Sequence, residues 1–121
     1  MKKILITDDS LFMRTSLERM LSDAGYLICK AENGKDMLEK YEQESPDLVT
    51  LDITMPEMDG REALRRLKEK HPDAKVVMVS AMGQKDMVLE AIRDGACDFI
   101  VKPFEKSRVM DAIQKVLAMR L

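Results

Sequence analysis

The chain has 121 residues, a length that suits one domain with one hydrophobic core, and we expect that domain to span residues 1–121. Hydrophobic residues make up 45% of the sequence and charged residues 35%, which is typical of a folded protein and argues against a disordered one. The formal net charge of -2 argues against direct nucleic-acid binding, and no apolar stretch approaches the roughly 20 residues that cross a bilayer, so we expect a cytoplasmic protein without membrane contact.

Short apolar runs alternate five times with longer stretches of helical periodicity. This alternation is typical of repeated strand–helix units. In chain order, the runs and the helical stripes lie at 4–6, 13–24, 27–29, 37–41, 48–51, 63–67, 76–79, 87–92, 99–101 and 109–117, and we expect the last helix to reach the C-terminus.

Four of the five apolar runs show no alternation with charged residues, as expected of strands that helices cover on both faces. The second run, flanked by Tyr26 and Lys30, is more polar, so we place it near an edge of the sheet. The sequence therefore predicts an α/β fold, a doubly wound, mostly parallel sheet of five strands with five helices on its two faces and right-handed crossovers.

Residues with chemical function follow four of the five predicted strands. Asp8 and Asp9 follow the first strand, Asp52 the third, Ser80 the fourth and Lys102 the fifth. The ends of parallel strands share one edge of a sheet, and ligands bind in the crevice outside that edge, so we expect these side chains to converge. Taken singly, each has a structural alternative: an acid can cap the next helix, a serine can be structural, and a lysine before a proline can begin a loop.

Three carboxylates placed together repel one another, and the single ammonium of Lys102 cannot balance them. A divalent cation is the simplest remedy, and a ligand set made of oxygen atoms favours Mg2+ over zinc. An ionised aspartate beside such a cation is a competent nucleophile toward phosphorus, and Asp52 is the natural candidate. The cation, Lys102 and the Ser80 hydroxyl would then neutralise the oxygens of the transferred phosphoryl group.

At these residues the whole chain resembles the receiver domain of bacterial response regulators. The matching motifs are Asp8-Asp9-Ser10, the segment 52–60, Ser80-Ala81 and Lys102-Pro103-Phe104. The segments 12–14 and 80–84 are similar to those of chemotaxis regulators of the CheY type. The resemblance implies a flavodoxin-like or CheY-like fold with strand order 2-1-3-4-5, and a signalling domain rather than an enzyme.

The resemblance also implies roles for the acids. Asp52 corresponds to the phosphoacceptor and one Mg2+ ligand. Asp9 corresponds to a direct Mg2+ ligand, Asp8 to a ligand that acts through water, and Thr54 to a residue whose backbone carbonyl completes the coordination. No organic cofactor is implied.

Around the phosphoryl group, the resemblance implies contacts from Ser80 and Lys102 and a cis peptide bond between Lys102 and Pro103. Phe99 corresponds to an aromatic switch residue whose rotamer follows Ser80, with simple core filling as the alternative. The family's more usual residue at this position is Tyr, and Phe99 lacks its hydroxyl, so switching would depend on packing.

Positions two residues after Asp52 and Ser80 tune dephosphorylation in the family. They are Thr54 and Met82 here, and a methionine cannot hold a water strongly, so the sequence makes no prediction about the lifetime of the phosphoryl group.

The partners implied are a histidine kinase as phosphodonor, an effector such as the flagellar motor switch in chemotaxis, and a phosphatase, with a monomeric chain. The effector-binding face would comprise the fourth helix, fifth strand and fifth helix, around Met87, Glu90, Ala91 and Lys106.

Four alternatives remain open. The chain could be a receiver from a transcription factor or could act in a phosphorelay. An aspartyl-phosphate phosphatase of the haloacid dehalogenase type would carry Asp-x-Asp on the first strand, unlike Asp8-Asp9-Ser10. A flavodoxin-like FMN-binding module would need a loop rich in Ser, Thr and Gly after that strand.

Overall fold

A computed structural model describes all residues 1–121 and shows five strands that alternate with five helices. The elements are β1 (Lys3–Thr7), α1 (Leu11–Asp23), β2 (Leu27–Ala31), α2 (Gly34–Glu44), β3 (Leu48–Asp52), α3 (Gly60–Lys70), β4 (Val76–Ala81), α4 (Lys85–Arg93), β5 (Asp98–Lys102) and α5 (Lys106–Leu117). The strands form one parallel sheet in the order β2-β1-β3-β4-β5, which confirms the predicted architecture.

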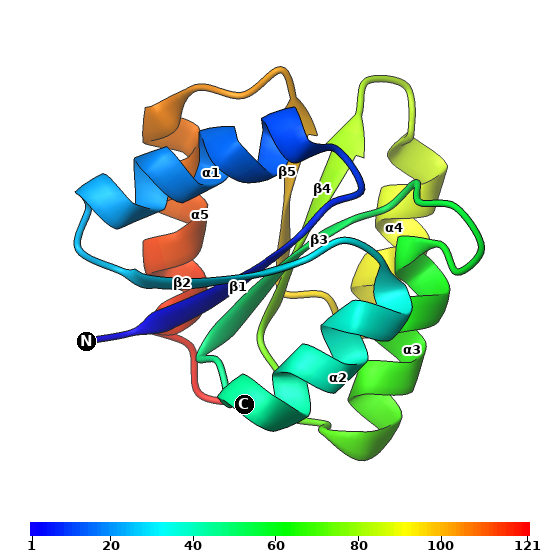
Figure 1. Cartoon of the computed structure of the whole chain (residues 1–121). Helices are drawn as coiled ribbons and strands as arrows, with labels where there is room; N and C mark the ends of the chain where they lie inside the picture. Colours follow the sequence, from blue (N-terminus) through cyan, green and yellow to red (C-terminus); the bar gives the residue numbers. More distant parts are fainter.

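The sheet separates two hydrophobic cores (Figure 1). Helices α1 and α5 cover one face, and their buried residues pack on side chains such as Ile4 and Ile6 of β1. Helices α2, α3 and α4 cover the other face and pack on side chains such as Leu5 and Val49. Every residue of β3 is buried, whereas Leu27 of β2 is 48% exposed, so the expected edge position of the second strand is confirmed.

Side-chain caps begin three of the helices. The side chains of Ser10, Asn33 and Asp59 each accept a hydrogen bond from the backbone N–H three residues later. These bonds satisfy donors that the first helical turn leaves free. The cap of α1 is therefore Ser10, and neither Asp8 nor Asp9 serves in this role.

The fifth helix ends before the C-terminus, so the expectation that it runs to the last residue is wrong. It stops at Leu117, with Ala118 as its C-cap. Val116 is the last fully buried residue of α5, and Leu117 and Met119 are only partly buried against the same core. No helix of the structure combines the length and the apolar character that a bilayer crossing requires.

Close backbone packing fixes the chain after β3. The N–H of Gly60 donates to the carbonyl of Ile53 at 2.7 Å. A Cβ at Gly60 would overlap the carbonyl oxygen of Asp52 and lie 2.8 Å from the Cα of Ile53. Only glycine fits here, and its close approach holds the β3–α3 loop beside the end of β3.

Candidate functional site

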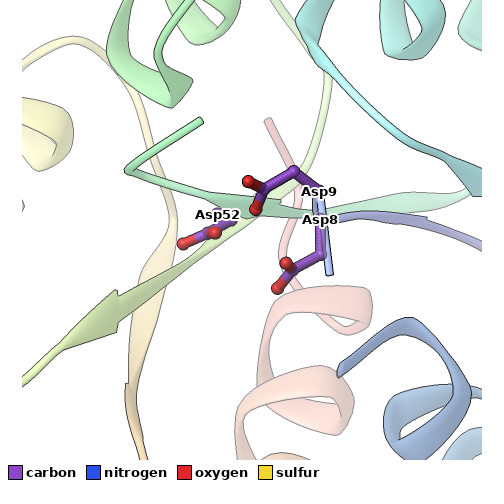
Figure 2. Close-up of side chains that lie close together, drawn as sticks. All are labelled: Asp8, Asp9 and Asp52. Carbon is purple, nitrogen blue, oxygen red and sulfur yellow. The ribbon is translucent and has the colours of Figure 1, made fainter. Parts of the chain in front are cut away.

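Three carboxylates meet where β1 and β3 end (Figure 2). Oxygen atoms of Asp8, Asp9 and Asp52 all lie within 4.8 Å of one another. Asp8 and Asp52 are buried, and Asp9 is exposed, so the cluster opens to solvent on one side. A buried, all-oxygen set with an open side suits Mg2+, which keeps several waters when it binds to proteins.

One ammonium enters this cluster from the end of β5. The Nζ atom of Lys102 lies 3.1 Å from Oδ2 of Asp8 and 3.5 Å from Oδ2 of Asp52. With all three acids ionised, one lysine leaves two negative charges uncompensated. This excess negative charge favours the binding of a divalent cation.

The pKa of Asp52 is raised from an ordinary value of 3.8 to about 6, and the largest cause is burial, which disfavours the charged form. The negative charges of Asp8 and, less strongly, of Asp9 contribute to this rise, while Lys102 opposes it. A cation bound between the acids would favour the ionised, nucleophilic form of Asp52.

Two hydrogen bonds, one to its side chain and one to its backbone carbonyl, hold Asp8 in place. Its Oδ1 accepts the N–H of Ser10 at 2.9 Å, and its carbonyl oxygen accepts from Nη1 of Arg14 at 2.7 Å. Arg14 thus holds the turn that presents Asp8 and Asp9. Sequence reasoning gave Arg14 no role, because nothing local indicates that a side chain in the first turns of α1 reaches back to the strand end.

Ser80 and Thr54 flank the acids on neighbouring elements. Ser80, at the end of β4, is 1% exposed, and its Oγ atom has no hydrogen-bond partner. Thr54 lies in the β3–α3 loop two residues after Asp52, and its Oγ1 accepts from Nε2 of Gln84 at 2.7 Å. Gln84 was also assigned no role from the sequence.

Phe99 is the second residue of β5, pairs with Met78 of β4 and is half buried. Its side chain lines a cavity of about 220 Å³ together with Ser80, Val88 and Leu89. Phe99 and Ser80 therefore border the same cavity. The peptide bond between Lys102 and Pro103 is cis.

The predicted effector-binding face needs a correction. Ala91 is fully buried in the core, and the carboxylate of Glu90 pairs with Arg61 of α3. Met87 packs against the core that α2, α3 and α4 share. Met87 and Ala91, four residues apart, share the side of α4 that faces the core, whereas the Glu90 side chain remains 48% exposed beside Arg61.

Other residues are exposed along α4, β5 and α5. The apolar ones are Leu89 (50% exposed), Ile92 (40%) and Val101 (37%), and Lys106 is exposed at the start of α5. These side chains and that of Glu90, but not that of Ala91, are available to a partner on this face.

Known proteins are similar to this chain in sequence and in fold. The family model for the response regulator receiver domain matches residues 4–114. The chemotaxis protein CheY of Listeria monocytogenes is 53% identical over 116 residues, covering 95% of this chain and 98% of that protein.

Solved structures agree. The receiver domain of NtrX from Brucella abortus superposes with a TM-score of 0.94 at 34% identity, covering 97% of this chain and 99% of that one. A complex of CheX and CheY with BeF3 and Mg2+ from Borrelia burgdorferi gives a TM-score of 0.92 at 36% identity, covering 98% of this chain and 90% of that one. With its motifs, strand order and acidic cluster in place, the chain belongs to the response regulator receiver family and is CheY-like.

Proposed function

We propose that Asp52 accepts a phosphoryl group from the phosphohistidine of a histidine kinase, with Mg2+ held by Asp8, Asp9, Asp52 and the Thr54 backbone carbonyl. The observation that carries the proposal is the cluster of Asp8, Asp9 and Asp52 with the Lys102 ammonium inside it. Acids held this close, with one lysine beside them, repel one another unless a cation binds, and such a charged cluster is typical of a functional site.

The transfer forms one bond and breaks another. An Oδ atom of Asp52 attacks phosphorus, the bond between phosphorus and the donor's imidazole nitrogen breaks, and its electron pair returns to the imidazole. When bound, Mg2+ supplies charge neutralisation for the phosphoryl oxygens. Lys102, already 3.5 Å from Asp52, supplies a second positive charge, and Ser80 supplies a hydroxyl donor.

Phosphorylation then acts on the neighbouring loops. The phosphoryl dianion attracts Ser80 and Lys102, and that attraction favours a conformation which the resting protein populates little. Phe99 can follow Ser80 because the cavity beside it is empty. To change the ratio of this conformation to the resting one from 1:99 to 99:1, phosphorylation must favour it by about 5.5 kcal/mol, which several charge-assisted contacts can supply.

For the effector we propose the flagellar motor switch in chemotaxis, contacted through Leu89, Ile92, Val101 and Lys106. Support comes from the printed names of the relatives, chemotaxis proteins of the CheY type. The Borrelia burgdorferi CheY in complex with CheX supports a further partner, which we propose to be a phosphatase.

Incubation with acetyl phosphate, with and without Mg2+, tests the acceptor. We expect intact mass spectrometry to show one added phosphoryl group on the wild-type chain only when Mg2+ is present. The Asp52→Asn variant should gain none, while Asp111→Asn, an exposed aspartate on α5, should behave as wild type. A phosphoryl increment that persists in Asp52→Asn would refute the assignment.

A pull-down with a purified motor-switch protein tests the effector. We expect binding only to the phosphorylated chain and a loss of binding in Leu89→Ser. Equal binding by both forms of the wild-type chain would refute this part of the proposal.

A further inference from the structure

The side chain of Gln84 joins the two loops that border the phosphorylation site. Its Oε1 atom accepts the backbone N–H of Ala81 at 2.7 Å, and its Nε2 atom donates to Oγ1 of Thr54 at 2.7 Å. Ala81 follows Ser80 at the end of β4, and Thr54 follows Asp52 by two residues. Both loops leave the same edge of the sheet (Figure 1), so one amide group connects the hydroxyl side of the site to the acid side.

The orientation of this amide is fixed by its partners. The Ala81 N–H can only donate, so the amide oxygen must face it, and the NH2 group then faces Thr54. In this orientation a single amide group makes both contacts.

Few other bonds hold the β4–α4 loop in place. The chain makes a turn at Met82 and Gly83, and the backbone N–H groups of these two residues donate to no group in the protein. Gln84 occupies the N-cap position of α4, yet its side chain makes no capping bond to that helix. Beneath the loop lies the cavity of about 220 Å³ that Phe99 and Val88 also line, so the loop has room to move.

We infer that Gln84 is a clasp that holds the β4–α4 loop in its resting position and opens when Asp52 is phosphorylated. The inference rests on the proposed function. Ser80 and Ala81 are consecutive, so a movement that brings the Ser80 hydroxyl to a phosphoryl group draws the Ala81 N–H away from Gln84. A hydrogen bond from the Ser80 hydroxyl to an anionic phosphoryl oxygen is stronger than one from the Ala81 N–H to the neutral amide of Gln84. Replacing the second bond by the first therefore favours the open state.

Shortening the side chain tests the clasp. Gln84→Asn keeps the amide but cannot reach both partners, and Gln84→Ala removes it. Gln114→Asn is the matched control, since Gln114 is an exposed glutamine on α5 without side-chain partners. Circular dichroism and thermal melting establish that each variant is folded. If Gln84→Ala does not fold, the test uses Gln84→Asn alone.

Two measurements separate a clasp from a merely structural residue. The first measurement is the amide chemical shifts of residues 81–84 and 99 in each unphosphorylated variant. These shifts are compared with the line that joins the shifts of resting and of phosphorylated wild-type protein. The rate of phosphorylation by acetyl phosphate with Mg2+ is measured in parallel. We expect both Gln84 variants to move toward the phosphorylated position and to react about fivefold faster, the factor that one net hydrogen bond supplies.

A double-mutant cycle with Thr54→Val completes the test. Thr54→Val removes the acceptor for Nε2, and we expect it to speed phosphorylation in the wild-type background but not in Gln84→Asn, because the clasp is already open there. The clasp is refuted by additive effects, by resting shifts and rates equal to those of Gln114→Asn, or by shifts that leave the line. A wild-type chain that gains no phosphoryl group would instead refute the proposed function.

Discussion

Asp52 should destabilise the folded chain when the site holds no metal. Its pKa of about 6 in the folded state exceeds the ordinary value of 3.8, so the folded state binds protons more tightly than the unfolded state does. The free energy of unfolding therefore falls as the pH rises through this window, and the cost is fully present above it. At about 1.36 kcal/mol for each tenfold change in proton affinity, the ionised form costs about 3 kcal/mol.

Replacement of Asp52 by Asn removes this cost. We expect urea unfolding in EDTA at pH 8, followed by circular dichroism, to show Asp52→Asn more stable than wild type by about 3 kcal/mol. The two chains should converge as the pH falls below 3.8, because Asp52 then becomes protonated in the unfolded as well as in the folded state of the wild type. For a chain of this length the gain corresponds to a rise in Tm of about 10 °C.

Asp111→Asn provides the control, since Asp111 is an exposed aspartate on α5. We expect it to change the free energy of unfolding by less than about 0.5 kcal/mol at either pH. Equal stability of Asp52→Asn and wild type at pH 8, or a gain that is the same at pH 4, would show that burial and the neighbouring acids do not disfavour the ionised carboxylate.

Three further outcomes are expected. Mg2+ at 100 times its Kd should stabilise wild type by about 2.7 kcal/mol in thermal melts, whereas the same concentration should have less effect on Asp9→Asn; equal stabilisation would exclude Asp9 as a ligand. Lys102→Met should slow phosphorylation by acetyl phosphate by on the order of 10²-fold, measured by intact mass, because a preorganised charge is lost; an unchanged rate would contradict that role. Gly60→Ala should lower both the free energy of unfolding, by about 1–3 kcal/mol, and the phosphorylation rate, since its Cβ displaces the β3–α3 loop. Gly25→Ala also strains the backbone, because the φ of Gly25 is 95°, but no atom lies close to its Cβ, so this variant should leave the phosphorylation rate unchanged. Equal rates in the two variants would refute the positional argument.

The effector-binding face shows where periodicity from the sequence is insufficient. Ala91 lies in a helix that the sequence predicted, but the side of that helix which faces solvent depends on how the helix is rotated against β4 and α3. Burial of Ala91 and the ion pair between Glu90 and Arg61 settle that rotation. Both are tertiary contacts, and neither has a local signature.

The sequence by itself determined the sheet, its edge strand and the edge at which Asp8, Asp52 and Lys102 meet. Hydrophobic periodicity depends only on neighbouring residues and can be read from the sequence, and the carboxyl ends of parallel strands in one sheet necessarily lie at the same edge. Only the tertiary structure decided that Gln84 reaches Thr54 and Ala81, that Arg14 holds Asp8, and that burial raises the pKa of Asp52. Those properties depend on distances between segments far apart in the chain, and such distances are fixed only when the loops pack.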